Sequence, residues 1–275
     1  MPDNKEIPQL AVYSSGSGSP TTIVLVHGFS CSARWWEPVG LQLRYKHRLL
    51  SVDLLGHGHS PRSPHGYSIE MQAHAVVAAL ERFEATDAIV VGHSMGGHIA
   101  IETAALAPER IRGIVAVDMP PRLAGNDIGV LARLALLPGI GNLARLTAPP
   151  ALTRRAMAGL FAPRFLAPRQ LVGDSRRMAR DSYVGSYRAM RRYMDRERSI
   201  GERLRDLAAR KLVIWGELDQ VWPLAHGREM AATAGATFFT VPRVGHSPHV
   251  EAPDAVASAL AEFAASLEAM PTAKE

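Results

Sequence analysis

Short runs of apolar residues, many of them β-branched, recur along the chain, and several end at a glycine, a histidine or an aspartate. Continuous apolar runs of this length are typical of strands that are buried on both faces of a sheet. The runs predict strands over Leu10–Tyr13, Ile23–Val26, Leu49–Leu54, Ala88–Val91, Ile114–Val117, Leu212–Trp215 and Thr237–Val241.

The stretches between these runs carry a helical pattern instead. Ser68–Phe83 repeats its apolar residues with the 3.6-residue period of an amphipathic helix, and Met95–Ala107 continues as a helix until Pro108 ends it. Pro253–Leu267 is rich in alanine and is also predicted to be helical. Strands that alternate with helices indicate an α/β fold, in which helices cover both faces of a mostly parallel sheet.

This alternation stops between about Pro120 and Arg210. The stretch contains helical segments, several prolines and many arginines, but no convincing strand. An insertion of this size between two strands is typical of a helical cap over the edge where the strands end. We therefore expect an α/β core formed by residues 1–120 and 211–275 and a helical cap, or lid, formed by residues 121–210.

Charge is spread unevenly between these two parts. The whole chain carries a net charge of +5, whereas residues 121–210 hold 18 arginines against seven acidic residues, a local net charge of +11. The excess either attracts an anionic substrate, membrane headgroups or nucleic acid, or belongs to solvated helix faces, and we favour the second interpretation. No motif supports the binding of nucleic acid.

The composition is that of an ordinary soluble globular protein, with 47% hydrophobic and 21% charged residues. The first ten residues lack the apolar segment of a signal peptide, and no apolar run is long enough to cross a bilayer. Cys31 is the one cysteine, so the chain has no internal disulfide, which agrees with a reducing compartment. We expect a cytoplasmic protein without stable membrane insertion.

A serine stands where a strand is expected to turn sharply into a helix. Residues 92–96 read Gly-His-Ser-Met-Gly, which matches the G-x-S-x-G motif, between the strand Ala88–Val91 and the helix Met95–Ala107. Such a turn strains the serine backbone and exposes its hydroxyl, and the flanking glycines avoid clashes with the neighbouring strand and helix. We predict that Ser94 is a nucleophile.

A serine nucleophile needs a general base, and eleven histidines compete for that role. His246 is the strongest candidate, because it follows the last expected strand and so lies at the sheet edge that also carries Ser94. Gly245 lets its loop expose the imidazole. His249, three residues further on, is the nearest rival.

The base in turn needs a carboxylate that orients it. Asp219 comes just after the strand Leu212–Trp215 and 27 residues before His246, which leaves room for one helix and one strand between them. Asp118, which also ends a strand, is the second choice, and Glu217 is a more distant one. Ser94, His246 and Asp219 are therefore the expected triad.

Acyl transfer also needs hydrogen-bond donors for the oxyanion that develops during the reaction. We expect the backbone N–H groups of Met95, next after the nucleophile, and of Phe29, after the strand Ile23–Val26, to supply them. Three other histidines near these positions are not expected to take part in catalysis, and they are His27, His93 and His98.

A second group of histidines suggests a metal site as an alternative. His57, His59 and His65 lie close together in sequence, and a His-x-His pair can bind zinc. No matching ligands occur elsewhere, so a hydrogen-bonded turn is the favoured interpretation. The chain also lacks a G-x-G-x-x-G after a strand and a P-loop. We expect neither a metal nor a cofactor.

Five segments together resemble the α/β-hydrolase fold superfamily, and specifically its capped serine esterase and hydrolase branch. The resemblance implies an eight-stranded, mainly parallel sheet, or a seven-stranded one if the short N-terminus lacks the first strand, with the cap inserted after strand six. The chain order Ser94, Asp219, His246 is that of this fold. The segments are Val26–Phe29, Asp53–Ser60, Val91–Gly97, Gly216–Val221 and Gly245–Pro253.

These residues predict a carboxylic-ester hydrolase that acts on a small or medium-sized acyl substrate through an acyl-enzyme on Ser94. A lactonase, a thioesterase, a carbon–carbon bond hydrolase or cyclase, and a non-catalytic receptor are the alternatives, because the fold does not choose the substrate. Trp35, Trp36 and Trp222 are expected to shape the acyl pocket, with core packing as the alternative for each. The pattern does not distinguish a monomer from a dimer.

Overall fold

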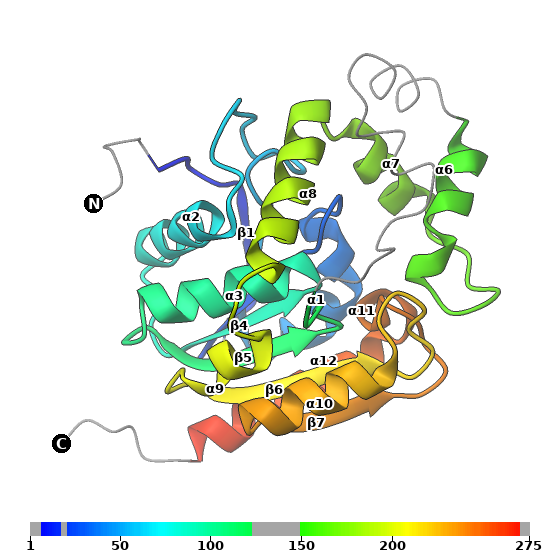
Figure 1. Cartoon of the computed structure of the whole chain (residues 1–275). Helices are drawn as coiled ribbons and strands as arrows, with labels where there is room; N and C mark the ends of the chain where they lie inside the picture. The colour runs from blue at the N-terminus through cyan, green and yellow to red at the C-terminus, as the bar shows by residue number, and fades with distance from the viewer. Residues whose placement is uncertain (1–6, 18–20, 123–148, 270–275) are drawn as a thin grey trace.

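The computed structural model describes residues 7–17, 21–122 and 149–269 of the chain. Seven strands form one sheet over these residues (Figure 1). The strands are β1 (Val12–Ser15), β2 (Thr22–Val26), β3 (Arg48–Val52), β4 (Ala88–His93), β5 (Ile111–Val117), β6 (Arg210–Gly216) and β7 (Thr237–Val241). Their order across the sheet is β1-β3-β2-β4-β5-β6-β7, and β1 alone runs antiparallel to its neighbour.

The α/β fold and the mostly parallel sheet predicted from the sequence are confirmed. Each strand overlaps the apolar run that predicted it. The described residues contain seven strands rather than eight. β1 pairs with β3 alone and forms one edge of the sheet. The helical insertion therefore follows the fifth strand of this sheet, β5.

The central strands β2 and β4 are buried along their whole length. Both are almost entirely apolar, because helices cover the two faces of the sheet and neither face meets water. The register places Val26 opposite Gly92 and His93 opposite Val117, so β2, β4 and β5 end at the same edge. The loops that follow these strands consequently meet at one side of the molecule.

Helices cover the two faces of the sheet in separate layers (Figure 1). On one face α1 (Glu37–Leu43) packs against α12 (Pro253–Glu268), and apolar side chains of both helices join one hydrophobic cluster. The other face is covered by α2 (Ile69–Arg82), α3 (Met95–Leu106) and α10 (Leu224–Ala234). None of the described helices is both long and apolar enough to cross a membrane.

The predicted helix at Ser68–Phe83 shows how local sequence sets these boundaries. The Ser68 side chain accepts a hydrogen bond of 3.1 Å from the N–H of Met71 and so caps the start of α2. Ala73, Val76 and Leu80 are buried at the spacing of a helical face. The periodicity in the sequence therefore predicted both the helix and its buried face.

Between β5 and β6 the described residues form helices and no strand. This agrees in character with the cap expected over residues 121–210, although residues 123–148 lie outside the described part of the chain. The division of the chain into core and cap domains stays a prediction. The described helices are α6 (Pro150–Ala156), the 3-10 turn η2 (Ala158–Leu160), α7 (Arg169–Arg177), α8 (Arg180–Met194) and α9 (Ile200–Arg205).

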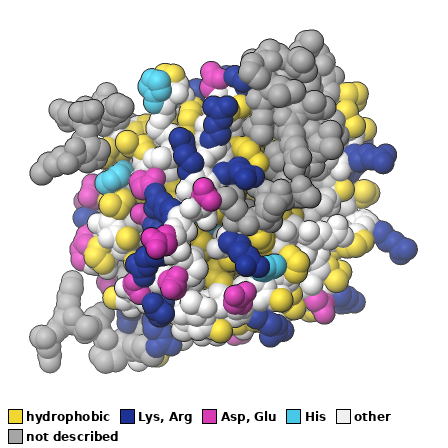
Figure 2. Space-filling view, in the orientation of Figure 1, with side chains coloured by type: hydrophobic (Ala, Val, Ile, Leu, Met, Phe, Trp, Pro, Cys, Tyr) yellow, Lys and Arg dark blue, Asp and Glu magenta, His cyan; other side chains and the backbone are white. Residues whose placement is uncertain are grey.

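Ion pairs connect these inserted helices to α2 and α3. Tyr193 of α8 donates a hydrogen bond of 2.7 Å to Glu102 of α3, and Arg203 of α9 forms an ion pair with the same carboxylate. Arg196 pairs with Glu70 of α2. On the face shown in Figure 2, basic and acidic side chains lie beside one another. Part of the arginine excess is thus used in contacts within the molecule.

His98 of α3 is fully buried beneath α8, where its ring lies 5.1 Å from that of Tyr193, centroid to centroid. Within the described part of the chain neither ring nitrogen has a hydrogen-bond partner. Burial, and then the charge of Arg203, lowers the pKa of His98 to about 3. The folded chain therefore keeps His98 neutral at mildly acidic pH.

We predict that His98→Phe makes the protein less sensitive to acid. The unfolded chain binds a proton at His98 below pH about 6.5, whereas the folded chain does not bind it until pH about 3, so the wild type loses stability across this window. At pH about 4.5 the variant should have lost about 2–3 kcal/mol less than the wild type, relative to pH 8. Urea unfolding at several pH values measures this, and parallel pH curves would contradict it.

Candidate active site

Ser94 lies in the sharp turn between β4 and α3 that the sequence predicted. Its backbone has φ 51° and ψ −119°, a left-handed conformation that is unfavourable for a residue with a side chain. The turn is held by hydrogen bonds from the N–H of Ser94 to the carbonyl of Val117 (2.9 Å) and from the N–H of Gly97 to the carbonyl of Ser94 (2.9 Å). Strain of this kind persists where the surrounding structure enforces it.

Two glycines make this turn sterically possible. A Cβ atom at position 92 would lie 2.2 Å from the carbonyl oxygen of Gly96, and one at position 96 would lie 2.5 Å from that of Val26. Both contacts are with backbone, which cannot move aside like a flexible side chain. The close approach of α3 to β2 and β4 therefore requires glycine at both positions.

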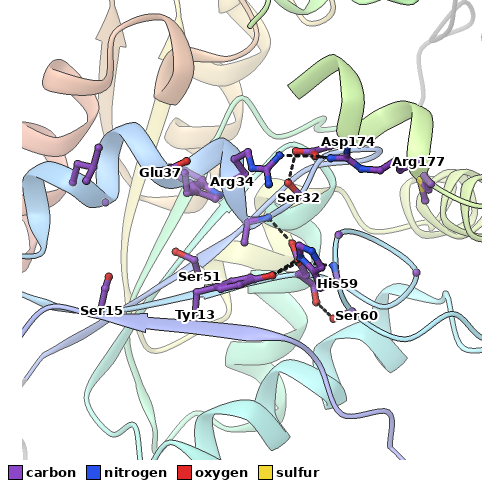
Figure 3. A pocket seen from close by; sticks show the side chains of 18 of the residues that line it. Tyr13, Ser15, Ser32, Arg34, Glu37, Ser51, His59, Ser60, Asp174 and Arg177 are labelled. Atoms are coloured by element: carbon purple, nitrogen blue, oxygen red, sulfur yellow. Dashed lines mark hydrogen bonds and ion pairs between the residues drawn. The ribbon is translucent and has the colours of Figure 1, made fainter. Parts of the chain in front are cut away.

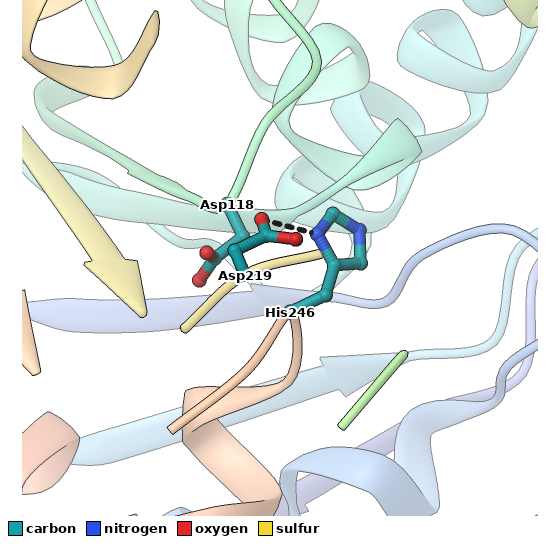
Figure 4. Close-up of side chains that lie close together, drawn as sticks. All are labelled: Asp118, Asp219 and His246. Atoms are coloured by element: carbon teal, nitrogen blue, oxygen red, sulfur yellow. Dashed lines mark hydrogen bonds and ion pairs between the residues drawn. The ribbon is translucent and has the colours of Figure 1, made fainter. Parts of the chain in front are cut away.

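His246 and Asp219 come together beside this edge of the sheet (Figure 4). Asp219 follows β6 and His246 follows β7, and both side chains are buried. Nδ1 of His246 donates a hydrogen bond of 2.8 Å to Oδ2 of Asp219. Because a carboxylate can only accept, Nδ1 carries the proton and Nε2 is the ring nitrogen that can take one up.

The carboxylate of Asp219 is held by its own loop as well as by the histidine. Its Oδ1 accepts hydrogen bonds from the N–H groups of Val221 (2.8 Å) and Trp222 (3.0 Å). Burial acts to raise the pKa of Asp219, but the charge and hydrogen bond of His246 and the N–H of Trp222 outweigh it and keep the pKa below its usual value. Asp219 is therefore a fixed anion at the Nδ1 edge of the His246 ring.

The rival histidines occupy structural positions. His249 is fully buried, with its ring 4.4 Å from that of Trp36, and burial keeps its pKa well below the usual value. Nε2 of His93 donates a hydrogen bond of 2.7 Å to the backbone carbonyl of His246. Burial, and then the charge of His246, lowers the pKa of His93 to about 3. His93 thus supports the His246 loop as a neutral donor.

The loop after β2 lies directly beside Ser94. A Cβ at Gly28 would lie 3.2 Å from Cβ of Ser94 and 2.8 Å from Nδ1 of His93. His27 holds this loop, since its Nδ1 donates to the carbonyl of Gly28 (2.8 Å) and its Nε2 accepts from the N–H of Leu54 (3.0 Å). Phe29, the next residue, is therefore close to the expected oxyanion position.

Met95, the other expected donor, is the first residue of α3. The first N–H groups of a helix have no acceptor within the helix and are free to bind an anion. An oxyanion near Ser94 would lie between this helix start and the loop of Phe29. The pairing of Phe29 and Met95 as oxyanion donors stays a prediction.

The three tryptophans expected at the acyl pocket all lie in hydrophobic clusters. Trp36 packs among residues of α1 and α12, and Trp222 packs near α10. Trp35 stacks on Phe161, with ring centroids 6.0 Å apart, and so contacts the inserted helices. All three are buried, which matches core packing, and their pocket role stays a prediction. Phe29, by contrast, is half-buried and packs against Tyr183 of α8, with ring centroids 4.6 Å apart.

The other carboxyl candidates contact backbone rather than His246. Oδ1 of Asp118 accepts from the N–H of Gly216 (3.0 Å), and Glu217 accepts from the N–H of Arg243 (2.9 Å) at the surface. Asp118, Asp219 and His246 nevertheless offer ligand atoms within 4.8 Å of one another, a spacing that a metal ion would accept. Asp219 already accepts three hydrogen bonds, which leaves it little capacity for a cation.

Glu251 of α11 (Pro248–Glu251) is a supporting residue that the sequence did not reveal. Its two carboxylate oxygens accept from the N–H of Gly245 (3.0 Å) and from the N–H of Ala162 (2.7 Å). It thereby ties the His246 loop to the inserted helices. An acidic residue five positions after His246 was visible in the sequence, but its contact with Ala162 joins positions 89 residues apart in the chain.

A cavity of about 720 Å³ lies elsewhere, where α7 meets the core (Figure 3). Its lining does not include Ser94, Asp219 or His246. Asp174 of α7 lines this cavity. Its carboxylate accepts a hydrogen bond from the hydroxyl of Ser32 (2.6 Å) and forms an ion pair with Arg34 (3.3 Å). We interpret these contacts as an attachment of α7 to the core.

The histidines of the zinc alternative do not converge. His57 is buried, with its ring 5.0 Å from that of His27, whereas His59 is exposed and its Nδ1 lies 2.7 Å from the hydroxyl of Tyr13. His65 is exposed. Among the described residues, the one group spaced to hold a metal is the set of Asp118, Asp219 and His246.

A mostly parallel sheet with a strained serine at a strand–helix turn, and with His and Asp on later loops, defines an α/β hydrolase architecture. A family model described as "Alpha/beta hydrolase family" matches residues 23–259, and the chain belongs to that family. This membership supports an enzyme of the hydrolase class.

The proteins that are similar to this chain carry names of different activities. The chain is 27% identical, over 91% of its length, to the dihydrolipoyllysine-residue acetyltransferase component of the acetoin cleaving system of Pseudomonas putida, and it spans 65% of that longer protein. A thermophilic esterase from Thermogutta terrifontis has a TM-score of 0.76 at 24% identity, covering 94% of this chain and 93% of its own. The N-acyl homoserine lactonase AidH has a TM-score of 0.77 at 22% identity, covering 98% and 97%.

We predict that Ser94→Gly gives a more stable protein than Ser94→Ala. Glycine adopts the left-handed conformation without strain, whereas alanine keeps the Cβ that causes it, so the glycine variant should be about 1 kcal/mol more stable after its greater unfolded-state entropy is included. Urea unfolding of the two variants measures the difference. A glycine variant that is less stable than the alanine variant would mean that the turn stores no strain.

Proposed function

We propose that this chain is a serine hydrolase that cleaves a carboxylic ester through an acyl-enzyme on Ser94. The observation that carries the proposal is the 2.8 Å hydrogen bond between His246 and Asp219, both buried, at the sheet edge that holds Ser94 in its strained turn. That bond fixes the tautomer that a general base needs. No other histidine within the described residues is bound to a carboxylate in a buried position at this edge.

In the first half of the reaction Nε2 of His246 removes the proton of the Ser94 hydroxyl, whose oxygen attacks the acyl carbonyl carbon. The negative charge that develops on the carbonyl oxygen is stabilised by the N–H groups of Phe29 and Met95. Asp219 stabilises the imidazolium that forms. His246 then donates its proton to the leaving alcohol, and the acyl group stays on Ser94.

In the second half a water molecule takes the place of the alcohol. His246 accepts a proton from the water, and the resulting nucleophile attacks the acyl carbon through the same oxyanion position. Collapse of this intermediate breaks the bond to Ser94, to which His246 returns the proton. The free acid leaves, and the site returns to its starting protonation state.

The substrate of this proposal is a small or medium-sized acyl compound that binds beneath the inserted helices. Phe29 and Tyr183 contact each other there, so an apolar acyl chain would meet aromatic side chains next to the expected oxyanion position. Cys31 is buried, and burial raises its pKa well above the usual value, so it offers no competing thiolate. A reducing compartment such as the cytoplasm suits this unpaired cysteine.

We predict that Ser94→Ala lowers kcat/KM for p-nitrophenyl esters by about 10⁴-fold or more, because the covalent route is lost. The same variant should not be labelled by an organophosphonate, while its circular dichroism stays that of the wild type. Ser266→Ala, a serine of α12 that donates to the carbonyl of Phe263, is the matched control and should keep full activity.

A panel of esters, thioesters and lactones, run on the wild type and on Ser94→Ala, identifies the bond that is cleaved. Turnover of the ester by Ser94→Ala at the wild-type rate would overturn the nucleophile. Labelling of Ser94 in the wild type together with negligible turnover of every substrate would instead point to a ligand-binding role.

We predict that kcat/KM falls as the pH is lowered, with a limiting slope of one. The reaction needs an unprotonated Nε2 on His246, and in acid the imidazolium cannot accept the serine proton. A pH profile for a neutral ester measures this, with unfolding monitored in parallel. Activity that stays constant as the pH is lowered until the protein unfolds would rule out His246 as the base.

A further inference from the structure

Asp118 is a second carboxyl group beside the pair formed by Asp219 and His246 (Figure 4). It follows β5, it is fully buried, and it offers an oxygen within 4.8 Å of the ligand atoms of the other two residues. The reaction described above makes no use of it. A buried carboxyl group that accepts few hydrogen bonds destabilises the folded state, so its presence at this site calls for a physical reason.

The fold holds Asp118 in place at a cost. Its φ of 42° is in the left-handed region, and its N–H donates to the carbonyl of Ile214 (3.0 Å). Oδ1 accepts from the N–H of Gly216 (3.0 Å), whereas Oδ2 accepts from no N–H or O–H donor within the described residues. A proton on Asp118 lets the carboxyl group donate a hydrogen bond to Asp219. These contacts join the end of β5 to the end of β6, just before the loop that carries Asp219.

The groups that act on Asp118 carry mostly negative charge. Asp219, from the loop after β6, has the largest effect of the neighbouring charges, and Glu251 of α11 adds a smaller one. The neighbouring group that can become positive is His246, from the loop after β7. Two buried carboxyl groups this close cannot both be ionised without a large cost, so one proton is kept within the pair.

Hydrogen bonding decides which carboxyl group keeps that proton. Asp219 accepts two bonds from backbone N–H groups and one from His246, whereas Asp118 accepts one from Gly216. Bonds of this kind favour the ionised form. Burial, and then the charge of Asp219, raises the pKa of Asp118 well above its usual value. The proton therefore lies on Asp118.

We propose that Asp118 is a positioning residue that keeps one proton in this carboxyl pair, so that Asp219 stays ionised and directed at His246. Asp118 can also take the place of Asp219 as the carboxylate beside His246. When position 219 has no charge, Asp118 releases its proton to solvent and supplies the negative charge next to the imidazole. This inference rests on the proposed function and adds a residue to it.

The test is a double-mutant cycle with Asp118→Asn and Asp219→Asn, read as kcat/KM for a p-nitrophenyl ester from about pH 5 to pH 9. Asp118→Asn alone should lower kcat/KM by no more than about tenfold, because an amide is neutral like the protonated acid and of the same shape. Asp219→Asn should keep residual activity through Asp118. The double variant should lose about a further hundredfold or more, as expected when a triad has no carboxylate.

The pH profile separates this role from a structural one. The residual activity of Asp219→Asn should fall in acid with an ionisation that the double variant lacks, because protonation of Asp118 removes the carboxylate that replaces Asp219 beside His246. Glu251 and His246 are present in both proteins and do not account for the difference. Equal loss from Asp118→Asn in both backgrounds, with unchanged profiles, would overturn the inference.

Three controls complete the experiment. Asp254→Asn on α12 makes the same chemical change at an exposed position and should have no effect in either background. Organophosphonate labelling of wild-type Ser94 tests the proposed function separately. If the wild type is labelled but the effects of the two substitutions simply add, only the role of Asp118 is refuted. Activity that is lost with EDTA and restored by Zn²⁺ would show that a cation, and not a proton, neutralises the pair, and would also overturn it.

Discussion

The close approach of backbone at Gly92 and Gly96 is the constraint on which the rest of the site depends. Because neither position has a Cβ, the start of α3 can lie against the carbonyl oxygens at the end of β2. The chain between the two glycines must then turn with Ser94 in a left-handed conformation. Gly28 also lies beside the serine, which brings the loop after β2 close to the start of α3.

Around this turn, buried polar groups are kept neutral except where charge has a use. His93 and His249 are buried next to the His246 loop, and burial lowers the pKa of both. Asp219 keeps its charge because three hydrogen-bond donors converge on it. A low-dielectric site strengthens the remaining interaction between Asp219 and His246, which is the one that orients the base. The neutral surroundings and the oriented hydrogen bond between His246 and Asp219 therefore belong to the same arrangement.

The inserted helices contribute in a different way. They contact the core through dispersed polar links, which include Glu102, Asp174 and Glu251. Of these, Glu251 bears most directly on the chemistry, since it joins the backbone of the His246 loop to that of Ala162. A substitution in the inserted segment can thus alter the position of His246 without contacting the substrate.

The sequence by itself determined the strands, the main helices and the place of Ser94, because these depend on local periodicity and on glycines a few residues apart. Strand order along the chain also sufficed to choose Asp219 and His246, since loops after parallel strands share one edge. Only the tertiary structure decided that His249 is buried against Trp36, that Glu251 binds Ala162, and that Asp118 lies within 4.8 Å of the chosen pair. Those facts depend on which distant segments meet and on how much water reaches them. Neither burial nor the balance of two neighbouring carboxyl groups can be read from a linear pattern.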